Sequence, residues 1–490
     1  MQREFAALLE TCRCGGPNGD SAAEVRDDSR EVRPGDIFVA VPGVAEDGSR
    51  FIPAAAEAGA GVIVCRPGTA ESAAAQARGC RVVQHENPRE ALWRLAQARW
   101  RTDELNLRVL GVTGTNGKTT STYLLERLFR EAGHKVGVMG TVSYRWPGHE
   151  ESAPLTTPGP LRVHSMLAQM AEAGVDVVVM EVSSHAIDQQ RVCGVPFAGA
   201  AFSNLTQDHL DFHKDMESYF KTKARLFLEL PRHDKLMAVN ADDPWGRRLL
   251  ELCPRALSFG LQKGAPNRRH LWGELLSAGT DGCHLRMSLG PQSWELRSPL
   301  VGAFNASNLL AVQALALEMG LEPAQFKALE SFTGVCGRLE RVENPRGLNV
   351  FVDYAHTPDA LVNVLKALRG AGFARIVTVF GCGGNRDRGK RPLMGEAVAR
   401  YADVAVLTSD NPRFEEPEAI LQDVLPGLKE ARHVLVEVDR RTATARALEM
   451  LGRNDALLIA GKGHENYQLI RGVKHHYSDQ EVVRELLQCA

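Results

Sequence analysis

The middle of the chain alternates short apolar runs with an amphipathic segment. Leu107–Val112 is an apolar run that predicts a strand, and Thr119–Ala132 carries apolar residues at the spacing of a helix. Val136–Val142 and Val175–Val182 are two further apolar runs. Strands that alternate with helices are typical of βαβ units, whose parallel strands are covered on both faces. The pattern therefore predicts a parallel sheet in this region.

The same alternation returns near Gly337 and continues toward the C-terminus. Helical stretches such as Pro358–Arg369 and Pro417–Glu430 separate a series of apolar runs. These runs predict strands at Val350–Val352, Ile376–Phe380, Val404–Leu407, Val434–Val438 and Ala456–Ala460. We expect them to form a second, Rossmann-like doubly wound sheet.

The first part of the chain reads as a smaller α/β unit. Asp36–Val41 and Gly61–Cys65 are apolar runs bounded by turn residues, which predicts strands. Ala54–Ala58 and Ala70–Ala77 are Ala-rich and predict helices, and Asn87–Trp100 has a helical pattern that can bridge to the next domain. A length of 490 residues suits about three domains. We therefore expect three α/β domains, at residues 1–88, 89–336 and 337–490.

Composition narrows the class of protein further. Lys plus Arg number 58 and Asp plus Glu 60, and 44% of the residues are hydrophobic. This balance argues against a disordered chain and against a nucleic-acid partner, which usually needs a basic excess. No apolar run approaches the roughly 18 residues that span a bilayer, and Met1–Glu10 lacks the apolar core of a secretory signal. We expect a cytoplasmic protein without a membrane span, whose scattered cysteines are reduced and mostly buried.

A glycine-rich loop follows the first strand of the central domain. Gly114–Thr120 (GTNGKTT) lies between a predicted strand and a predicted helix, as a phosphate-binding loop requires. Lys118 would reach the β- and γ-phosphates, and the Thr119 hydroxyl would bind Mg²⁺. The match to G-x-x-x-x-G-K-S/T is imperfect, because position 112 is Val. Glu181 ends a neighbouring predicted strand and is a candidate metal ligand, and the alternative is a glycine turn with a chance lysine.

Several other motifs follow this loop in a characteristic order. They are EVSSH at Glu181–His185, NLTQDHLDFH at Asn204–His213, GAFNASN at Gly302–Asn308, GRLE at Gly337–Glu340, DYAHTP at Asp353–Pro358, GCGGNRDRGK at Gly381–Lys390, DNPR at Asp410–Arg413 and GKGHE at Gly461–Glu465. The ordered set resembles the Mur ligases of peptidoglycan synthesis. The resemblance covers essentially the whole chain, since Asp28–Arg30 and Gly35–Gly43 also fit that family.

The resemblance implies an amide ligase that works in two steps. ATP phosphorylates a substrate carboxylate, and an amine then displaces the phosphate. The DNPR motif resembles the members that add meso-diaminopimelate to UDP-N-acetylmuramoyl-L-Ala-D-Glu, so we expect these two molecules and ATP as substrates and a monomeric enzyme. The three domains would then bind UDP, ATP and the amino acid, respectively.

The resemblance also assigns residues to each ligand. For ATP they are Gly114, Thr115, Asn116, Gly117, Lys118, Thr119, Thr120, Asn305, Asn308, Arg338 and Asp353. For two Mg²⁺ ions they are Thr119, Glu181, His209 and Lys223, and the catalytic residues are Lys118, His209 and Lys223. For the UDP substrate they are Ser29, Thr156, Thr157, Ser183, Gln189 and Arg191. By another reading, Asn305 caps a helix at Ala306–Met319, and His209 is a surface residue.

Lys223 carries a specific expectation. It fits the family pattern Y-x-x-x-K-x-x-L-F that begins at Tyr219, in which CO₂ carbamylates the lysine. Carbamylation converts an ammonium into an anion that can bind Mg²⁺. Lys221 is the neighbouring alternative, but it does not have this spacing.

The amino-acid pocket implied by the resemblance comprises Arg386, Asp410, Asn411, Pro412, Arg413, Gly461 and Glu465. Diaminopimelate has a second amino-acid centre where lysine has only an ammonium. Arg413 can bind the extra carboxylate bidentately, and Glu465 suits the ammonium. The alternatives are an ordinary Asn-Pro turn at this motif, a lysine-adding or folylpolyglutamate-type ligase, a P-loop ATPase that acts as a switch or motor, and a scaffold without catalysis.

Overall fold

The computed structural model describes residues 2–14, 23–43, 46–229, 231–265, 268–279 and 282–488, with the backbone alone for 231–235. Its contacts divide the chain into two compact units. Unit 1 comprises Met1–Thr113, Gly133–Ala200 and Thr222–Lys235, and unit 2 comprises Gly114–Ala132, Ala201–Lys221 and Leu236–Ala490. The predicted α/β class is confirmed, while the three domain boundaries stay predictions. Among the described residues, no helix is long and apolar enough to cross a membrane, and the cysteines are free thiols, most of them buried.

Unit 1 begins with a four-stranded parallel sheet in the order β1-β2-β3-β4. Two apolar clusters pack on this sheet, one containing Leu8 and Leu95 and the other Ile52 and Ala75. The strands are β1 (Val25–Arg26), β2 (Ile37–Val39), β3 (Val62–Cys65) and β4 (Arg81–Gln84), and the helices are α1 (Gln2–Cys14), α2 (Ile52–Glu57), α3 (Glu71–Ala77) and α4 (Pro88–Trp100). The strands and helices predicted here are therefore confirmed, each within a few residues of its expected bounds.

A second set of strands in unit 1 carries Glu181. In this set β9 (Val177–Glu181) pairs in parallel with β5 (Arg108–Thr113) and with β6 (Val136–Met139). All five residues of β9 are buried, as a strand with neighbours on both sides requires. The antiparallel strands β7 (Ser143–Trp146) and β8 (His149–Ser152), which the sequence analysis did not predict, extend the set beyond β6. Helices α6 (Pro160–Glu172) and α7 (Ser184–Asp188) also belong to unit 1, and α9 (Met216–Leu228) crosses the division.

Unit 2 contains α5 (Lys118–Glu131) and strands β12 to β15, whereas β11 crosses the division at Leu236. Strands β11 and β12 and strands β12 and β13 pair in parallel, whereas β13, β14 and β15 form an antiparallel meander. Their bounds are β11 (Pro231–Asn240), β12 (Leu257–Gly260), β13 (His270–Gly279), β14 (Gly282–Leu289) and β15 (Gln292–Ser298), with helices α10 (Pro244–Leu252) and α11 (Ala303–Glu318). The prediction of a purely parallel central sheet is therefore wrong for β13, β14 and β15, which pair antiparallel.

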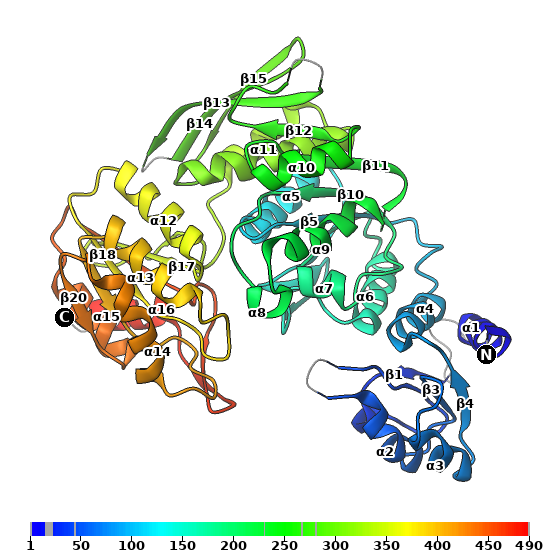
Figure 1. Ribbon diagram of the computed structural model, residues 1–490. Coiled ribbons are helices and arrows are strands. Elements are labelled where there is room, and N and C mark those ends of the chain that lie inside the picture. The colour runs from blue at the N-terminus through cyan, green and yellow to red at the C-terminus, as the bar shows by residue number, and fades with distance from the viewer. Residues whose placement is uncertain are drawn as a thin grey trace. The chain divides into compact units, whose positions relative to one another are not determined.

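The C-terminal part of unit 2 is a six-stranded sheet in the order β16-β17-β21-β18-β19-β20, coloured yellow to red in Figure 1. All its pairs are parallel except β16 with β17. One apolar cluster includes side chains of α12, α13 and α14, and another includes side chains of α15 and α16. The strands are β16 (Glu340–Arg341), β17 (Asn349–Asp353), β18 (Ile376–Phe380), β19 (Val404–Leu407), β20 (Val434–Val436) and β21 (Ala456–Ala460), and the helices are α12 (Pro358–Gly370), α13 (Lys390–Tyr401), α14 (Pro417–Val424), α15 (Arg440–Glu449) and α16 (Asp479–Gln488). This is the doubly wound sheet that the sequence predicted.

Two predicted elements end three or more residues earlier than expected. The helix predicted at Pro417–Glu430 ends at Val424 and continues as the 3₁₀ helix η4 (Leu425–Leu428), which contains Pro426. Proline lacks the N–H that an α-helical bond needs. The strand predicted at Val136–Val142 ends at Met139, because the chain turns at Gly140. A Cβ at Gly140 would lie 2.6 Å from Glu181 Oε1, so glycine allows the turn to pass close to that carboxylate.

Candidate functional site

The phosphate-binding loop joins the end of β5 to the start of α5. Gly114 and Gly117 have φ angles of 148° and 87°, which favour glycine. A Cβ at Gly114 would lie 1.9 Å from Ser203 Oγ, so the loop also needs glycine for space. Lys118 Nζ donates to the carbonyl oxygens of Gly114 and Thr115, both at 2.9 Å, which keeps its ammonium over the loop. This geometry suits a cradle for an anionic phosphate at a helix N-terminus.

The segment after β10 (Phe197–Phe202) braces this loop. Asn204 Oδ1 accepts from the Asn116 backbone N–H at 2.9 Å, and Asn204 Nδ2 donates to the Asn116 carbonyl at 3.2 Å. Ser203 Oγ donates to the same carbonyl at 2.6 Å. The Thr206 backbone N–H donates to Thr115 Oγ1 at 3.0 Å. The loop conformation is therefore set in advance by neighbouring side chains, which reduces the entropy lost when a ligand binds.

The two asparagines assigned to ATP lie on the first turns of α11. Asn308 Nδ2 donates to Asn305 Oδ1 at 3.0 Å, and Asn305 Nδ2 donates to the Val301 carbonyl at 2.9 Å. A Cβ at Gly117 would lie 2.3 Å from Asn308 Oδ1, so this pair packs against the phosphate loop. The alternative prediction that Asn305 caps the helix is wrong. Helix α11 begins at Ala303, and its N-cap is Gly302, whose φ of 97° favours glycine.

Arg338 and Asp353 lie in the C-terminal part of unit 2, and Arg338 contacts α5. Arg338 Nη2 donates to Thr119 Oγ1 at 2.8 Å, and its guanidinium lies over the Tyr354 ring, 4.6 Å from the centroid. Asp353 accepts from the backbone N–H groups of Leu339 at 2.6 Å and Ala355 at 2.7 Å. Burial raises the pKa of the Asp353 carboxyl, while the charge of Arg338 opposes that shift. The structure therefore brings Arg338 to the predicted ATP loop.

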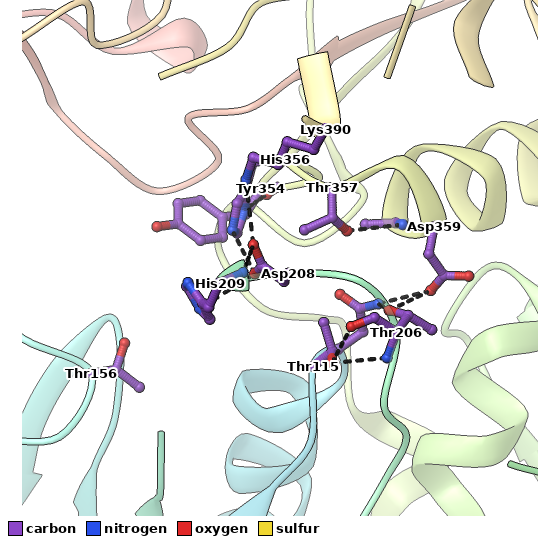
Figure 2. A network of polar contacts seen from close by, with 12 residues as sticks. Thr115, Thr156, Thr206, Asp208, His209, Tyr354, His356, Thr357, Asp359 and Lys390 are labelled. Atoms are coloured by element: carbon purple, nitrogen blue, oxygen red, sulfur yellow. Dashed lines mark hydrogen bonds and ion pairs between the residues drawn. The ribbon is translucent and has the colours of Figure 1, made fainter. Parts of the chain in front are cut away.

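Figure 2 shows a polar network around Asp208. Among the residues that contact Asp208, only His209 was predicted as a site residue. Asp208 contacts Lys390 Nζ at 3.4 Å, His209 Nε2 at 3.3 Å and His356 Nε2 at 4.0 Å. Burial raises the pKa of Asp208, but Lys390 and the two histidines outweigh burial and hold the pKa well below its usual range. Burial and Lys390 lower the pKa of His356 to about 4. Asp208, His356 and Lys390 lie inside the quoted motifs, so the motif positions were the available signal.

Another arm of the network ties α12 to the phosphate loop. Asp359 Oδ2 accepts from Asn116 Nδ2 at 2.8 Å and from Thr206 Oγ1 at 3.5 Å. Burial raises the pKa of Asp359, and its hydrogen bond with Asn116 opposes that shift. Asp359 was not predicted, although it directly follows the DYAHTP motif.

Within unit 1, the buried Glu181 closes strand β9. Its Oε1 accepts from the Thr141 backbone N–H at 2.8 Å, and its Oε2 accepts from Thr141 Oγ1 at 2.8 Å. Thr141 Oγ1 in turn lies 3.2 Å from Thr156 Oγ1, which links the predicted metal ligand to the predicted UDP-substrate residues. The carboxylate is thereby held in one orientation at the strand end.

Five of the six residues predicted for the UDP substrate gather around this strand end. Thr157 Oγ1 donates to the Glu181 carbonyl at 2.8 Å and accepts from the Ser183 backbone N–H at 3.1 Å. Arg191 Nη1 donates to the Thr157 carbonyl at 3.1 Å, and Arg191 Nη2 donates to Gln189 Oε1 at 2.6 Å. Burial lowers the pKa of Arg191. The sixth residue, Ser29, lies apart from this set on the short helix η1 (Ser29–Glu31), which Asp28 caps.

Burial distinguishes Lys223 from the neighbouring lysine in the sequence. The Lys223 side chain is 1% exposed, and its Nζ lies 3.4 Å from Thr113 Oγ1 at the end of β5. The Lys221 side chain is 70% exposed and pairs with Glu217 at 3.4 Å. Buried lysines are rare unless they have a partner or a function, so Lys223 is the better candidate for a chemical role.

The residues predicted for the amino acid lie where β18, β19 and β21 end. Asn411 Nδ2 donates to Glu465 Oε2 at 2.8 Å, and Arg413 Nη1 donates to the Gly384 carbonyl at 2.7 Å. A Cβ at Gly461 would lie 2.5 Å from Asp410 Oδ2, and a Cβ at Gly383 would lie 3.8 Å from Arg386 Cγ and 2.7 Å from Arg413 Nη1. Pro412, which precedes Arg413, is buried. Ligands of doubly wound sheets bind at this end of the strands, so the placement suits a pocket.

Charges of both signs face one another in this cluster. Burial raises the pKa of Asp410, but Lys462 and Arg440 outweigh burial and lower the pKa. Burial and the charge of Asp410 raise the pKa of Glu465. Burial and then the charge of Arg386 lower the pKa of Arg413. An amino acid, which carries a carboxylate and an ammonium, offers a partner for both kinds of charge.

Lys462 is a member of this cluster that the sequence analysis missed. Its side chain is 0% exposed, and its Nζ donates to Asn411 Oδ1 at 3.2 Å and to Glu465 Oε2 at 3.2 Å. It therefore holds two of the predicted pocket residues in place. Its position inside GKGHE was the only sequence signal, because a lone lysine ordinarily indicates a surface residue.

The fold and the loop together define a nucleotide-binding protein with a phosphate loop and an adjoining doubly wound sheet. Three family models match the chain, namely the Mur ligase family catalytic domain at residues 23–100, the Mur ligase middle domain at 112–316 and the Mur ligase glutamate ligase domain at 337–463. The chain belongs to the Mur ligase family.

Individual relatives agree with this assignment. UDP-N-acetylmuramoyl-L-alanyl-D-glutamate–2,6-diaminopimelate ligase of Lawsonia intracellularis is 54% identical over 94% of this chain and 95% of its own length. The protein of the same name from Gloeobacter violaceus is 45% identical over 94% of this chain and 92% of its own length. A solved structure of a ligase with this name is 32% identical, with a TM-score of 0.65, and covers 95% of this chain and 94% of its own. A folylpolyglutamate synthase from Mycobacterium tuberculosis, 18% identical over 77% of this chain and 92% of its own with a TM-score of 0.60, shares the fold.

Proposed function

We propose that this chain uses ATP to join meso-2,6-diaminopimelate to the γ-carboxylate of the D-Glu residue in UDP-N-acetylmuramoyl-L-Ala-D-Glu, releasing ADP and phosphate. The observation that carries the proposal is the cluster of Asp410, Asn411, Arg413 and Glu465, which offers carboxylate and ammonium partners at one end of the C-terminal sheet. High identity to ligases of that name over nearly their whole length supports it.

In the first step, an oxygen of the substrate carboxylate attacks the γ-phosphorus of ATP, and the bond to the β-phosphate oxygen breaks. The products are an acyl phosphate and ADP. Two anions must approach each other, so most of the catalysis is positioning and charge stabilisation. Lys118 is held over the loop by two carbonyl groups and supplies a cation for the transferring phosphoryl group. Asn305 and Asn308 would hold the adenine, and Arg338 and Asp353 would hold the phosphates and the ribose.

In the second step, the neutral amine of diaminopimelate attacks the acyl carbon. A tetrahedral intermediate forms, the nitrogen loses one proton to solvent, the acyl–phosphate bond breaks, and phosphate leaves with the former carboxylate oxygen. Arg413 would bind the carboxylate at the far end of diaminopimelate, and Glu465 would bind the ammonium beside it. The UDP substrate would be held by Thr156, Thr157, Ser183, Gln189 and Arg191. Ser29 would contact the uridine.

The donor set also fits Mg²⁺. Mg²⁺ prefers oxygen ligands, and the Thr119 hydroxyl and the Glu181 carboxylate are the oxygen donors that the family resemblance assigns to it. A carbamylated Lys223 would add a third oxygen donor, and His209 would assist a second ion. Bound Mg²⁺ would offset the repulsion between the carboxylate and the γ-phosphate. The number of ions, the monomeric state and the cytoplasmic location stay predictions.

Carbamylation of Lys223 has a direct test. Intact-mass measurement in bicarbonate-containing buffer should show a species about 44 Da heavier, which corresponds to the addition of one CO₂, lost on acidification or in a Lys223→Ala variant. Lys223→Ala should lower kcat at least about a hundredfold, because a metal-binding anion is lost. The matched control is Lys221→Ala, which alters an exposed lysine on the same helix and should change neither the mass species nor kcat. Carbamylation that persists in Lys223→Ala, or full activity of that variant, would contradict the assignment.

The function itself is tested by phosphate release. ATP, Mg²⁺ and UDP-N-acetylmuramoyl-L-Ala-D-Glu are supplied with meso-diaminopimelate or with L-lysine in parallel. Release should require both the nucleotide dipeptide and diaminopimelate, with L-lysine a poor substitute, since it offers Arg413 no far carboxylate. A preference for lysine would contradict the proposed role of Arg413. Phosphate release with ATP alone would instead indicate an ATPase that acts as a switch or motor.

A further inference from the structure

A fully buried ion pair lies beneath the proposed amino-acid pocket. Arg440 is the first residue of α15 and Asp479 is the first residue of α16, and both side chains are 0% exposed. Arg440 Nε donates to Asp479 Oδ1 at 2.9 Å, and Arg440 Nη2 donates to Asp479 Oδ2 at 2.8 Å. This bidentate geometry uses two of the five donors of the guanidinium and fixes its plane.

The guanidinium also contacts the two strand ends that lead into the pocket. Arg440 Nη2 donates to the Ala460 carbonyl at 2.9 Å, and Arg440 Nη1 lies 3.5 Å from the Ser409 carbonyl. Ala460 directly precedes Gly461, and Ser409 directly precedes Asp410. One side chain therefore ties the loop 410–413 to the loop 461–465. These two loops carry nearly all of the residues proposed to bind the amino acid.

Stability alone is a weak reason for such a pair. Removing two charges from water costs much of what their attraction returns, and well-packed apolar residues of similar volume often replace buried ion pairs without loss. An apolar pair, however, cannot donate to the two carbonyl groups. The planar fork of an arginine can reach several acceptors at fixed angles, and a lysine ammonium cannot. The arrangement thus favours a geometric role over a purely stabilising one.

We propose that Arg440, oriented by Asp479, is a positioning residue for the amino-acid substrate. It sets the spacing between the loop with Asp410 and Arg413 and the loop with Glu465, and through that spacing it sets the affinity for diaminopimelate. The inference rests on the proposed function, because it concerns the pocket of the same reaction. Arg440 itself touches no substrate in this account.

The test compares two double variants that remove an ion pair between the same two helices. Arg440→Met with Asp479→Leu removes the buried pair, and Arg441→Met with Glu485→Leu removes an exposed pair whose side chains are 50% and 57% exposed. In the first variant the KM for diaminopimelate should rise at least about tenfold, while the KM for ATP and for the nucleotide dipeptide stays within about twofold. The control variant should leave all three KM values within about twofold of the wild type.

Single variants keep the inference testable if the buried double variant does not fold. Asp479→Asn retains the guanidinium but weakens its orientation, so it should raise the KM for diaminopimelate by a smaller factor. Arg440→Lys keeps the charge and should fail to restore the wild-type KM, because one ammonium cannot serve Asp479 and both carbonyl groups. Thermal unfolding of each variant separates loss of fold from loss of positioning.

The outcomes separate this inference from the function on which it rests. An unchanged KM for diaminopimelate in a folded variant, or an equal rise in the KM of all three substrates, overturns the positioning role and leaves the ligase intact. Wild-type protein without diaminopimelate-dependent turnover overturns the proposed function and this inference with it. A selective rise in the KM for diaminopimelate, absent from the Arg441 control, supports the inference.

Discussion

Lys118→Ala should lower kcat for phosphate release by about three orders of magnitude, because the variant loses a preorganised cation at the transferring phosphoryl group. The ammonium is held over the loop by the Gly114 and Thr115 carbonyl groups. Alanine is a good helix former at the start of α5, so the helix should form in the variant. Steady-state phosphate release at saturating substrates measures the effect.

Lys327→Ala is the matched control for this prediction. Lys327 lies exposed on the 3₁₀ helix η3 (Pro323–Ser331), and its replacement should leave kcat within about twofold. Circular dichroism of both variants should match the wild type. A Lys118→Ala variant that keeps kcat within about threefold of the wild type would remove the phosphate-loop role from the account.

Arg413→Ala should raise the KM for meso-diaminopimelate by about a hundredfold or more and change the KM for ATP little. The physical reason is that a bidentate guanidinium–carboxylate contact is lost, and burial makes that contact strong. Arg413→Lys should recover only part of the loss, since an ammonium is a point charge without the planar fork. Initial rates at varied diaminopimelate and fixed ATP supply both constants.

The backbone at Arg413 needs its own control. Its φ angle is 56°, so alanine inherits the same strained conformation and Arg413→Gly relieves it. Because both variants lack the guanidinium, both should show a similar rise in the KM for diaminopimelate. Arg432→Ala is the control: it replaces an exposed arginine that pairs with Asp403 and should change neither KM value. Unchanged catalytic efficiency of Arg413→Ala for diaminopimelate would contradict the pocket.

The strands predicted most accurately are those buried on both faces. Ile376–Phe380, Val404–Leu407 and Ala456–Ala460 match β18, β19 and β21 at both ends, because a continuous apolar run is itself the signature of a central parallel strand. The meander of β13, β14 and β15 was missed. Its strands carry mixed burial, as in β14, and their pairing depends on neighbours that a local pattern does not show.

The candidate site divides in the same way. Lys118, Glu181 and Arg413 were predictable, because each lies in a motif whose spacing implies a chemical role. Arg440 was not, because a single basic residue outside any motif ordinarily indicates a solvated side chain, and Lys462 lies inside GKGHE but was given no role there. Arg440 can be buried because it pairs with Asp479, which lies 39 positions further along the chain. The packing of α15 and α16 on the sheet brings the two residues together.

The central claim is that the chain forms an amide through an acyl phosphate, and isotope transfer tests it most directly. UDP-N-acetylmuramoyl-L-Ala-D-Glu with ¹⁸O at both oxygens of the D-Glu γ-carboxylate is incubated with ATP, Mg²⁺ and meso-diaminopimelate, and the released phosphate is analysed by mass spectrometry. Each released phosphate should contain one ¹⁸O atom, and the tripeptide product should be heavier than the labelled dipeptide substrate by the mass of diaminopimelate minus one ¹⁸O-labelled water. Unlabelled phosphate would mean that water attacks ATP directly, and it would contradict the ligase mechanism.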